Sequence, residues 1–157
     1  MQPLDPAETE EHRIRRILGR SRTIAVVGAS ADASRPSHRV MAFLQSRGYR
    51  TIPVNPRAAG TTILGIPCVA RLEDIGEPVD LVDIFRVPSA VPAVVDSAIR
   101  IGAKAVWMQL GIRHDAAAQS AAAAGLDVVM DRCPAIDMPR LGISGPDPSN
   151  ARPTRDA

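Results

Sequence analysis

One loop of the chain combines residue types that can bind a phosphate. Gly28, Ala29 and Ser30 directly follow a short apolar run, and Arg35 and Ser37 precede an expected helix. Backbone amides at a helix start donate hydrogen bonds to anions, and the helix dipole favours negative charge there. Ser37 is expected to cap this helix and to offer its hydroxyl to the phosphate. The alternative is a tight-turn glycine with an ordinary cap, because the loop lacks the further glycines of a GxGxxG pattern.

A second group of polar residues ends the next apolar run. Val54 is followed by Asn55, Pro56 and Arg57. NAD-binding Rossmann domains usually have Asp or Glu at this place, where the carboxylate binds the ribose hydroxyls. An amide and a cation instead of the carboxylate favour a ligand with an additional phosphate on its adenosine part, as in coenzyme A and NADP. A solvated loop arginine is the alternative.

A third group follows two later apolar runs. Phe85, Arg86 and Pro88 come after one run, and Gln109 ends the next. In an open parallel sheet the ligand lies outside the carboxyl ends of the strands, where the strand order reverses. We therefore expect these residues to line the same crevice as the two loops above. We expect Cys133 to be a small, buried packing residue.

Short apolar runs and helical patterns alternate along the chain and predict the elements that position these residues. Strands are expected at Thr23–Val27, Arg50–Val54, Ile66–Val69 (an edge strand), Val79–Phe85, Lys104–Leu110 and Leu126–Met130. Helices are expected over residues 5–19 (capped by Asp5), from Ser37 to Gly48, from Pro88 onward and over Asp115–Ala124. This alternation predicts an α/β fold: a single Rossmann-like doubly wound parallel sheet, strand order about 3-2-1-4-5-6, with helices on both faces.

The length of 157 residues allows one domain with one core. We expect an N-terminal helix (1–20) packed on the domain, a Rossmann-like domain (21–141) and a flexible tail (142–157). The tail is rich in Pro, Gly, Ser and Asp, a composition that buries little apolar surface.

Composition argues against several other classes of protein. A net charge of +2 and 3% aromatic residues speak against nucleic-acid binding. There is no apolar run long enough for a membrane span and no signal-peptide pattern. Two lone cysteines fit a reduced, cytoplasmic protein and cannot form a zinc site by themselves.

Several stretches resemble a known family. The segments "TIAVVGAS", "RPSHRV", "YRTIPVNP", "VDLVDIFRVP", "GAKAVWMQLGI" and "VVMDRCP" closely resemble the stand-alone CoA-binding proteins of the YccU-like family. These are in turn similar to the amino-terminal domain of the succinyl-CoA synthetase α subunit. The resemblance runs from about Thr23 to Leu141.

The resemblance implies a site for coenzyme A at the three groups. Gly28, Ala29, Ser30 and Ser37 would hold the pyrophosphate, with Arg35 beside them. Val54, Asn55, Pro56 and Arg57 would border the adenosine, with Arg57 a candidate for the 3′-phosphate. Phe85, Arg86 and Pro88 would line the far side, and Gln109 would border the pantetheine arm, whereas Trp107 is expected in the core.

The expected function is binding of CoA or acyl-CoA, without catalysis by this chain alone. The larger synthetases carry a phosphorylated histidine in a second α/β domain, and this chain ends before such a domain, so no catalytic residue is assigned. Two alternatives stay open: a detached subunit of an acyl-CoA synthetase, and an NAD(P)-binding redox-sensing module. The expected partner is small-molecule CoA or acyl-CoA; a partner enzyme or a homo-oligomer is left open.

Overall fold

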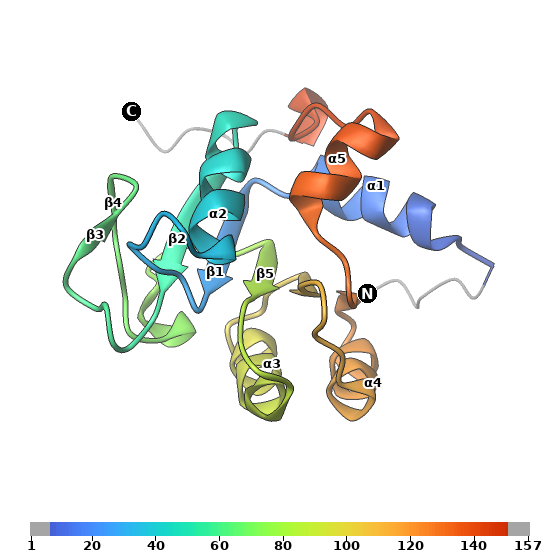
Figure 1. The fold of residues 1–157 in the computed structure, drawn as a ribbon. Coiled ribbons are helices and arrows are strands. Elements are labelled where there is room, and N and C mark those ends of the chain that lie inside the picture. Colours follow the sequence, from blue (N-terminus) through green and yellow to red (C-terminus); the bar gives the residue numbers. More distant parts are fainter. Residues whose placement is uncertain (1–6, 151–157) are drawn as a thin grey trace, which may run out of the picture.

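A five-stranded parallel sheet forms the centre of the molecule (Figure 1). The computed structural model describes residues 7–150. The strands are β1 (Thr23–Val27), β2 (Arg50–Val54), β5 (Leu81–Ile84), β6 (Ala105–Met108) and β7 (Asp127–Val129). They lie in the order β2-β1-β5-β6-β7, and all neighbours are parallel. The predicted Rossmann-like α/β class is confirmed.

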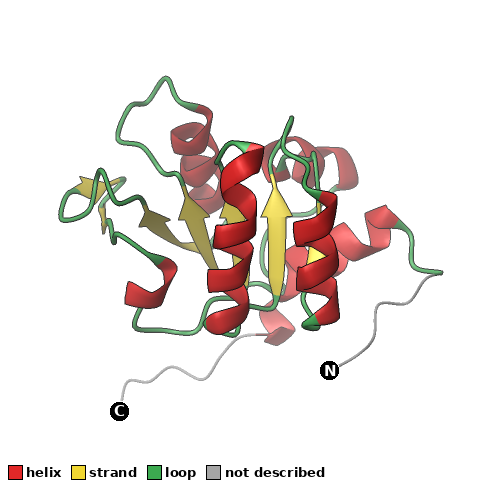
Figure 2. Ribbon diagram, turned by 90° about the horizontal axis from the view of Figure 1, so that it is seen from below, coloured by secondary structure: helices red, strands yellow, loops and turns green. Residues whose placement is uncertain are grey.

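Helices cover both faces of this sheet. The helices α1 (Glu10–Arg20), α2 (Pro36–Ser46) and α5 (Pro134–Leu141) bury their apolar side chains against one face. The helices α3 (Val91–Arg100) and α4 (Asp115–Ala123) cover the other face, as Figure 2 shows from below. Two short 3₁₀ turns, η1 (Leu72–Asp74) and η2 (Pro88–Ala90), lie in the connections before β5 and α3. The molecule therefore has three layers, with one apolar core on each side of the sheet.

The expected third strand, Ile66–Val69, is not a strand of this sheet. The chain instead forms a small antiparallel hairpin from β3 (Thr62–Ile63) and β4 (Ile66–Pro67). Leu64 and Gly65 both have positive φ, which is the geometry of a two-residue hairpin turn. Pro67 has no N–H to donate to a ladder. Only Val69 reaches β2, through one isolated parallel bridge to Val54, so the observed order lacks the expected edge strand.

The N-terminal helix packs on the domain but begins later than predicted. It is capped by Thr9, whose side-chain oxygen accepts a hydrogen bond from the His12 amide at 3.1 Å. The expected cap, Asp5, lies outside the described residues. Arg16 extends from this helix and donates to Asp127 of β7 at 2.7 Å. Because the apolar stripe of α1 is also completely buried, the helix belongs to the core.

A helix that the sequence analysis did not predict follows β7. Pro134 occupies the first position of α5, and Gly142 ends it in the left-handed conformation. Both are ordinary helix-boundary signals. The helix also holds Pro139 in its interior, which is unfavourable for a helix. Burial of Met138 and Leu141 in the core stabilises it.

The segment after α5 also differs from the expected flexible tail. The Asp147 amide donates to the Gly19 carbonyl at 2.6 Å, and Arg22 donates to the Asp147 carbonyl at 2.6 Å. A short 3₁₀ turn, η3 (Pro148–Asn150), follows. Asp147 thus connects this segment to the end of α1 and the loop after it, and the Ile143 carbonyl accepts a hydrogen bond from Arg47 at 3.2 Å. Residues 151–157 lie outside the described part. No helix within residues 7–150 is long and apolar enough to span a membrane.

Candidate functional site

The strand order reverses between β1 and β5, and their carboxyl ends meet there. Gly28 directly follows β1 with φ of +87°, and a Cβ atom at this position would collide with the carbonyl of Phe85, which directly follows β5. The glycine is therefore required by the contact between the two strand ends, independently of any ligand. The close contact leaves the loops after β1 and β5 on opposite sides of one crevice, at the place where ligands bind in open α/β sheets.

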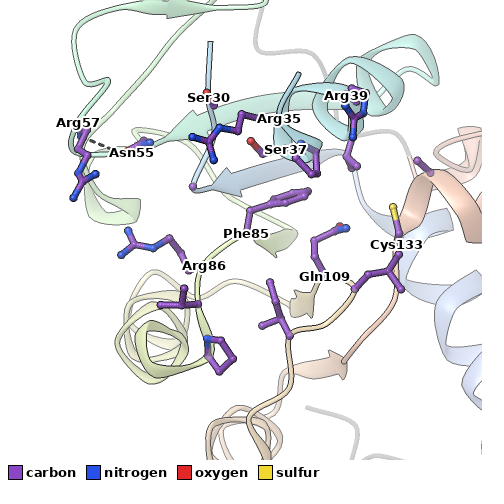
Figure 3. Close-up of a pocket in the computed structure, with 18 of the residues that line it drawn as sticks. Ser30, Arg35, Ser37, Arg39, Asn55, Arg57, Phe85, Arg86, Gln109 and Cys133 are labelled. Carbon is purple, nitrogen blue, oxygen red and sulfur yellow. Dashed lines mark hydrogen bonds between the residues drawn. The ribbon is translucent and has the colours of Figure 1, made fainter. Parts of the chain in front are cut away.

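A cavity of about 1250 Å³ opens at this edge of the sheet (Figure 3). Most of the predicted site residues line it: Gly28, Ser30, Arg35, Ser37, Asn55, Pro56, Arg57, Phe85, Arg86, Pro88 and Gln109. Among the described residues, no Asp or Glu lines the cavity. The structure thus brings together residues that are far apart in the chain in a pocket with cationic side chains and no acidic ones.

Two predicted site residues do not line this pocket. Ala29 and Val54 are buried in the core, at 1% and 3% exposure. Side chains alternate between the two faces of an extended chain, so residues adjacent in sequence do not all face the ligand side. Their backbone still shapes the site, because the Ala29 carbonyl accepts a hydrogen bond from Asn55 at 2.9 Å.

The start of α2 offers hydrogen-bond donors to the pocket. Contrary to the prediction, Ser37 is not the cap: Arg35 is at the N-cap without a side-chain bond, and Pro36 occupies the first helical position. Ser37 therefore lies inside the first turn, with its side chain 4% exposed but on the pocket wall. Within residues 7–149 neither its amide nor its hydroxyl has a hydrogen-bond partner. Both are available to an anion at the helix N-terminus.

Four arginines line the pocket. Arg57 and Arg86 have no acidic partner among the described residues, and Arg35 has only Asp32 at 3.9 Å. Arg39, which the site prediction omitted, also lines the pocket, but its guanidinium donates to the Ser34 carbonyl at 2.8 Å. Within the described residues the guanidinium groups of Arg57 and Arg86 are thus free to meet a polyanionic ligand, and Arg35 is held only by its exposed pair with Asp32.

Asn55 organises the loop after β2. Its side-chain nitrogen donates to the Ala29 carbonyl at 2.9 Å, and its side-chain oxygen accepts from the Arg57 amide at 3.0 Å. Figure 3 shows the second bond as a dashed line. Both ends of the amide are therefore used by the protein. Asn55 holds the loop that carries Arg57 against the loop after β1.

The opposite end of the pocket is formed by β6 and α5. Besides Gln109, its lining residues are Leu110, Ile112, Cys133 and Ala135. The sequence analysis did not assign Leu110 and Ile112 to the site, and it missed the helix that carries Ala135. Cys133 is buried, as expected, and is also part of the pocket wall. Trp107, expected in the core, is completely buried and donates to the Arg132 carbonyl at 2.8 Å.

A buried carboxyl lies behind this end of the pocket. Asp83 of β5 is completely buried, and within the described residues it forms no salt bridge. With its amide nitrogen turned toward Asp83, Gln109 donates to both carboxylate oxygens at 2.8 and 3.1 Å. Burial raises the pKa of Asp83 well above its ordinary value. A single charged residue inside the apolar run "LVDIF" is the sequence signal that could have singled it out.

No group of three His, Cys, Asp or Glu side chains that could hold a metal occurs in the described part of the chain.

The sequence matches the CoA binding domain family over residues 22–139, which includes the sheet, the pocket and most of α5. The chain belongs to this family. The matched range ends within α5, so the CoA-binding domain includes the helix that the sequence analysis missed.

Individual relatives of this CoA-binding domain agree in fold and length. It is 37% identical to the uncharacterized protein YneT of Bacillus subtilis (strain 168) over 129 residues, which are 82% of this chain and 92% of YneT. A structure from Thermus thermophilus is 41% identical with a TM-score of 0.81, covering 85% of this chain and 99% of that chain.

A larger enzyme contains a similar domain. The dinucleotide-forming acetyl-coenzyme A synthetase 1 of Ca. Korarchaeum cryptofilum is 25% identical, with a TM-score of 0.63. The match covers 73% of this chain but only 27% of that enzyme. The CoA-binding domain described here therefore corresponds to about a quarter of the synthetase.

Proposed function

We propose that this protein binds CoA or acyl-CoA in the pocket at the carboxyl edge of the sheet. The observation that carries the proposal is the arrangement at the start of α2, where the unpartnered Ser37 donors face a pocket with free arginines and no acidic lining residue. This arrangement fits a ligand with several phosphates. Membership of the CoA-binding domain family supports coenzyme A as that ligand.

We assign each part of coenzyme A to one part of the pocket. The pyrophosphate would be held by the start of α2 and the loop after β1, through Ser37 and Arg35. The adenosine would border the loop after β2, where Arg57 is available to the 3′-phosphate and no carboxylate is present to bind ribose hydroxyls as in NAD-binding domains. The pantetheine arm would pass Phe85 toward Gln109.

We further propose that the chain binds its ligand without catalysing a reaction alone. The described lining residues include no Asp, Glu, His or Lys that could act as a general acid or base. A subunit that works with a partner synthetase is the second candidate, favoured by the similar domain within acetyl-coenzyme A synthetase. The free Cys68 and Cys133 are compatible with a reducing, cytoplasmic setting.

Isothermal titration calorimetry with CoA, dephospho-CoA and NAD tests the binding proposal. We expect CoA to bind more tightly than dephospho-CoA, because only CoA carries the additional phosphate, and NAD to bind weakly or not at all. Tighter binding of NAD than of CoA would contradict the proposal. Co-purification of the protein with a synthetase partner would support the second candidate.

A further inference from the structure

Two exposed apolar side chains belong to the wall of the pocket. Three large apolar residues of the described chain are more than half exposed: Val87 (62%), Leu110 (55%) and Ile136 (54%). Val87 and Leu110 belong to the pocket wall, whereas Ile136 does not. Val87 follows β5 and Leu110 follows β6, so both lie at the carboxyl edge of the sheet. Exposed apolar surface at a concave site commonly marks the place of an apolar ligand group.

The pocket changes from charged to uncharged along the strand order. Arg57 and Arg86 lie on one side of Figure 3, whereas Gln109 and Cys133 lie on the opposite side. All lining residues that β6, its following loop and α5 contribute are uncharged. Arg39 of α2 also lies toward this side in Figure 3, and its guanidinium donates to the Ser34 carbonyl at 2.8 Å. A ligand with phosphates at the start of α2 therefore has Arg57 and Arg86 on one side and the uncharged residues of β6 and α5 on the other.

We propose that the half of the pocket formed by β6 and α5 accepts the aliphatic acyl chain of an acyl-CoA. This inference rests on the proposed binding of CoA, because it uses the phosphates to set the direction of the ligand. The acyl chain would cover Leu110, which follows β6, and remove its exposed apolar surface from water. A carboxylate on the acyl chain would find no cation from β6 or α5, and Arg39 of α2 already donates to the Ser34 carbonyl, so burial of the carboxylate there is unfavourable.

The position of the two side chains favours a ligand over a protein partner. Val87 and Leu110 form the wall of the same pocket that contains the arginines. One elongated molecule can therefore contact both ends of the pocket. Its phosphates would bind the arginines, and its apolar part would contact the apolar side chains. A protein partner or a second copy of the chain could cover these side chains without contacting the arginines of the pocket.

Calorimetry with CoA, hexanoyl-CoA and succinyl-CoA tests this inference. We expect hexanoyl-CoA to bind about tenfold more tightly than CoA, because several methylene groups leave water. Succinyl-CoA should bind no more tightly than CoA. Leu110→Asp should bring the ratio of hexanoyl-CoA to CoA affinity close to one, and because Leu110 is exposed the variant should still fold. Ile136→Asp is the matched control, with similar exposure outside the pocket, and should keep the ratio of the parent.

The outcomes separate this inference from the proposed function. CoA binding without any advantage for hexanoyl-CoA would overturn the acyl site and leave the CoA site intact. The same result combined with a change of oligomeric state in Leu110→Asp, measured by analytical ultracentrifugation, would show that a protein surface covers Leu110. Absence of binding for every CoA compound would overturn the CoA site and the acyl site together.

Discussion

The side-chain amide of Gln109 lies 2.8 and 3.1 Å from the two oxygens of the buried Asp83. A charged carboxylate would accept hydrogen bonds from the amide nitrogen, whereas a protonated carboxyl would donate to the amide oxygen. Gln109 lines the pocket, so the protonation state of Asp83 determines which end of a pocket-lining amide faces the buried carboxyl.

Asp83→Asn should remove a pH dependence of stability. Burial raises the pKa of Asp83 in the folded state, whereas in the unfolded chain this carboxyl has its ordinary pKa of about 3.9. Between these two values the folded state binds more protons, so its stability decreases as the pH rises. Relative to the variant, the parent should lose up to about 1.4 kcal/mol of unfolding free energy per pH unit in this window.

Urea unfolding of both proteins at a series of pH values upward from about 4, the ordinary pKa of an Asp, measures this difference. Comparison with Asp83→Asn cancels the titration of the other groups. Asp115→Asn, which removes an exposed carboxyl, checks that the effect belongs to Asp83. A difference between parent and Asp83→Asn that stays constant with pH would contradict the prediction.

Gly28→Ala should destabilise the fold more than the same change at another glycine with positive φ. The new Cβ would collide with the Phe85 carbonyl in addition to straining the backbone. Together these effects should cost about 2–4 kcal/mol of unfolding free energy. Gly102→Ala is the matched control, because Gly102 has φ of +75° and open space around a Cβ. In this variant only backbone strain lowers the unfolding free energy, by about 1–2 kcal/mol. Equal losses of unfolding free energy in Gly28→Ala and Gly102→Ala, measured by chemical denaturation, would contradict a close contact between Gly28 and the Phe85 carbonyl.

Ser37→Ala should weaken CoA binding with little change of melting temperature. The Ser37 hydroxyl does not cap α2, so its removal should not cost the stability of a helix cap. Loss of a hydrogen bond to a charged phosphate should reduce affinity by roughly tenfold or more. Ser46→Ala, at the other end of α2, is the control for affinity. A lower melting temperature with unchanged affinity would show that Ser37 is structural.

Arg57→Ala should abolish the preference for CoA over dephospho-CoA. The guanidinium has no acidic partner in the described part of the chain, so its removal should leave stability nearly unchanged. Affinity for CoA should fall by roughly tenfold, whereas affinity for dephospho-CoA should change little. Arg71→Ala removes the same charge at an exposed surface pair and should affect neither ligand. If Arg57→Ala lowers both affinities equally, Arg57 does not bind the 3′-phosphate.

Local patterns in the sequence determined the order of the main strands and helices. Apolar runs ending at Gly28, Asn55 and Phe85 were recognisable because a strand that is buried on both faces needs a continuous apolar segment. The βα alternation then required parallel strands whose carboxyl ends meet at one edge. For this reason most of the site residues could be named from the sequence.

Only the tertiary structure decided how these residues are used. The helix α5 forms despite Pro139 because Met138 and Leu141 are buried in the core. Asn55 is occupied by contacts to a loop distant in the chain, and Leu110 becomes part of a pocket wall. Such contacts depend on the packing of segments far apart in sequence, and local periodicity carries no information about them.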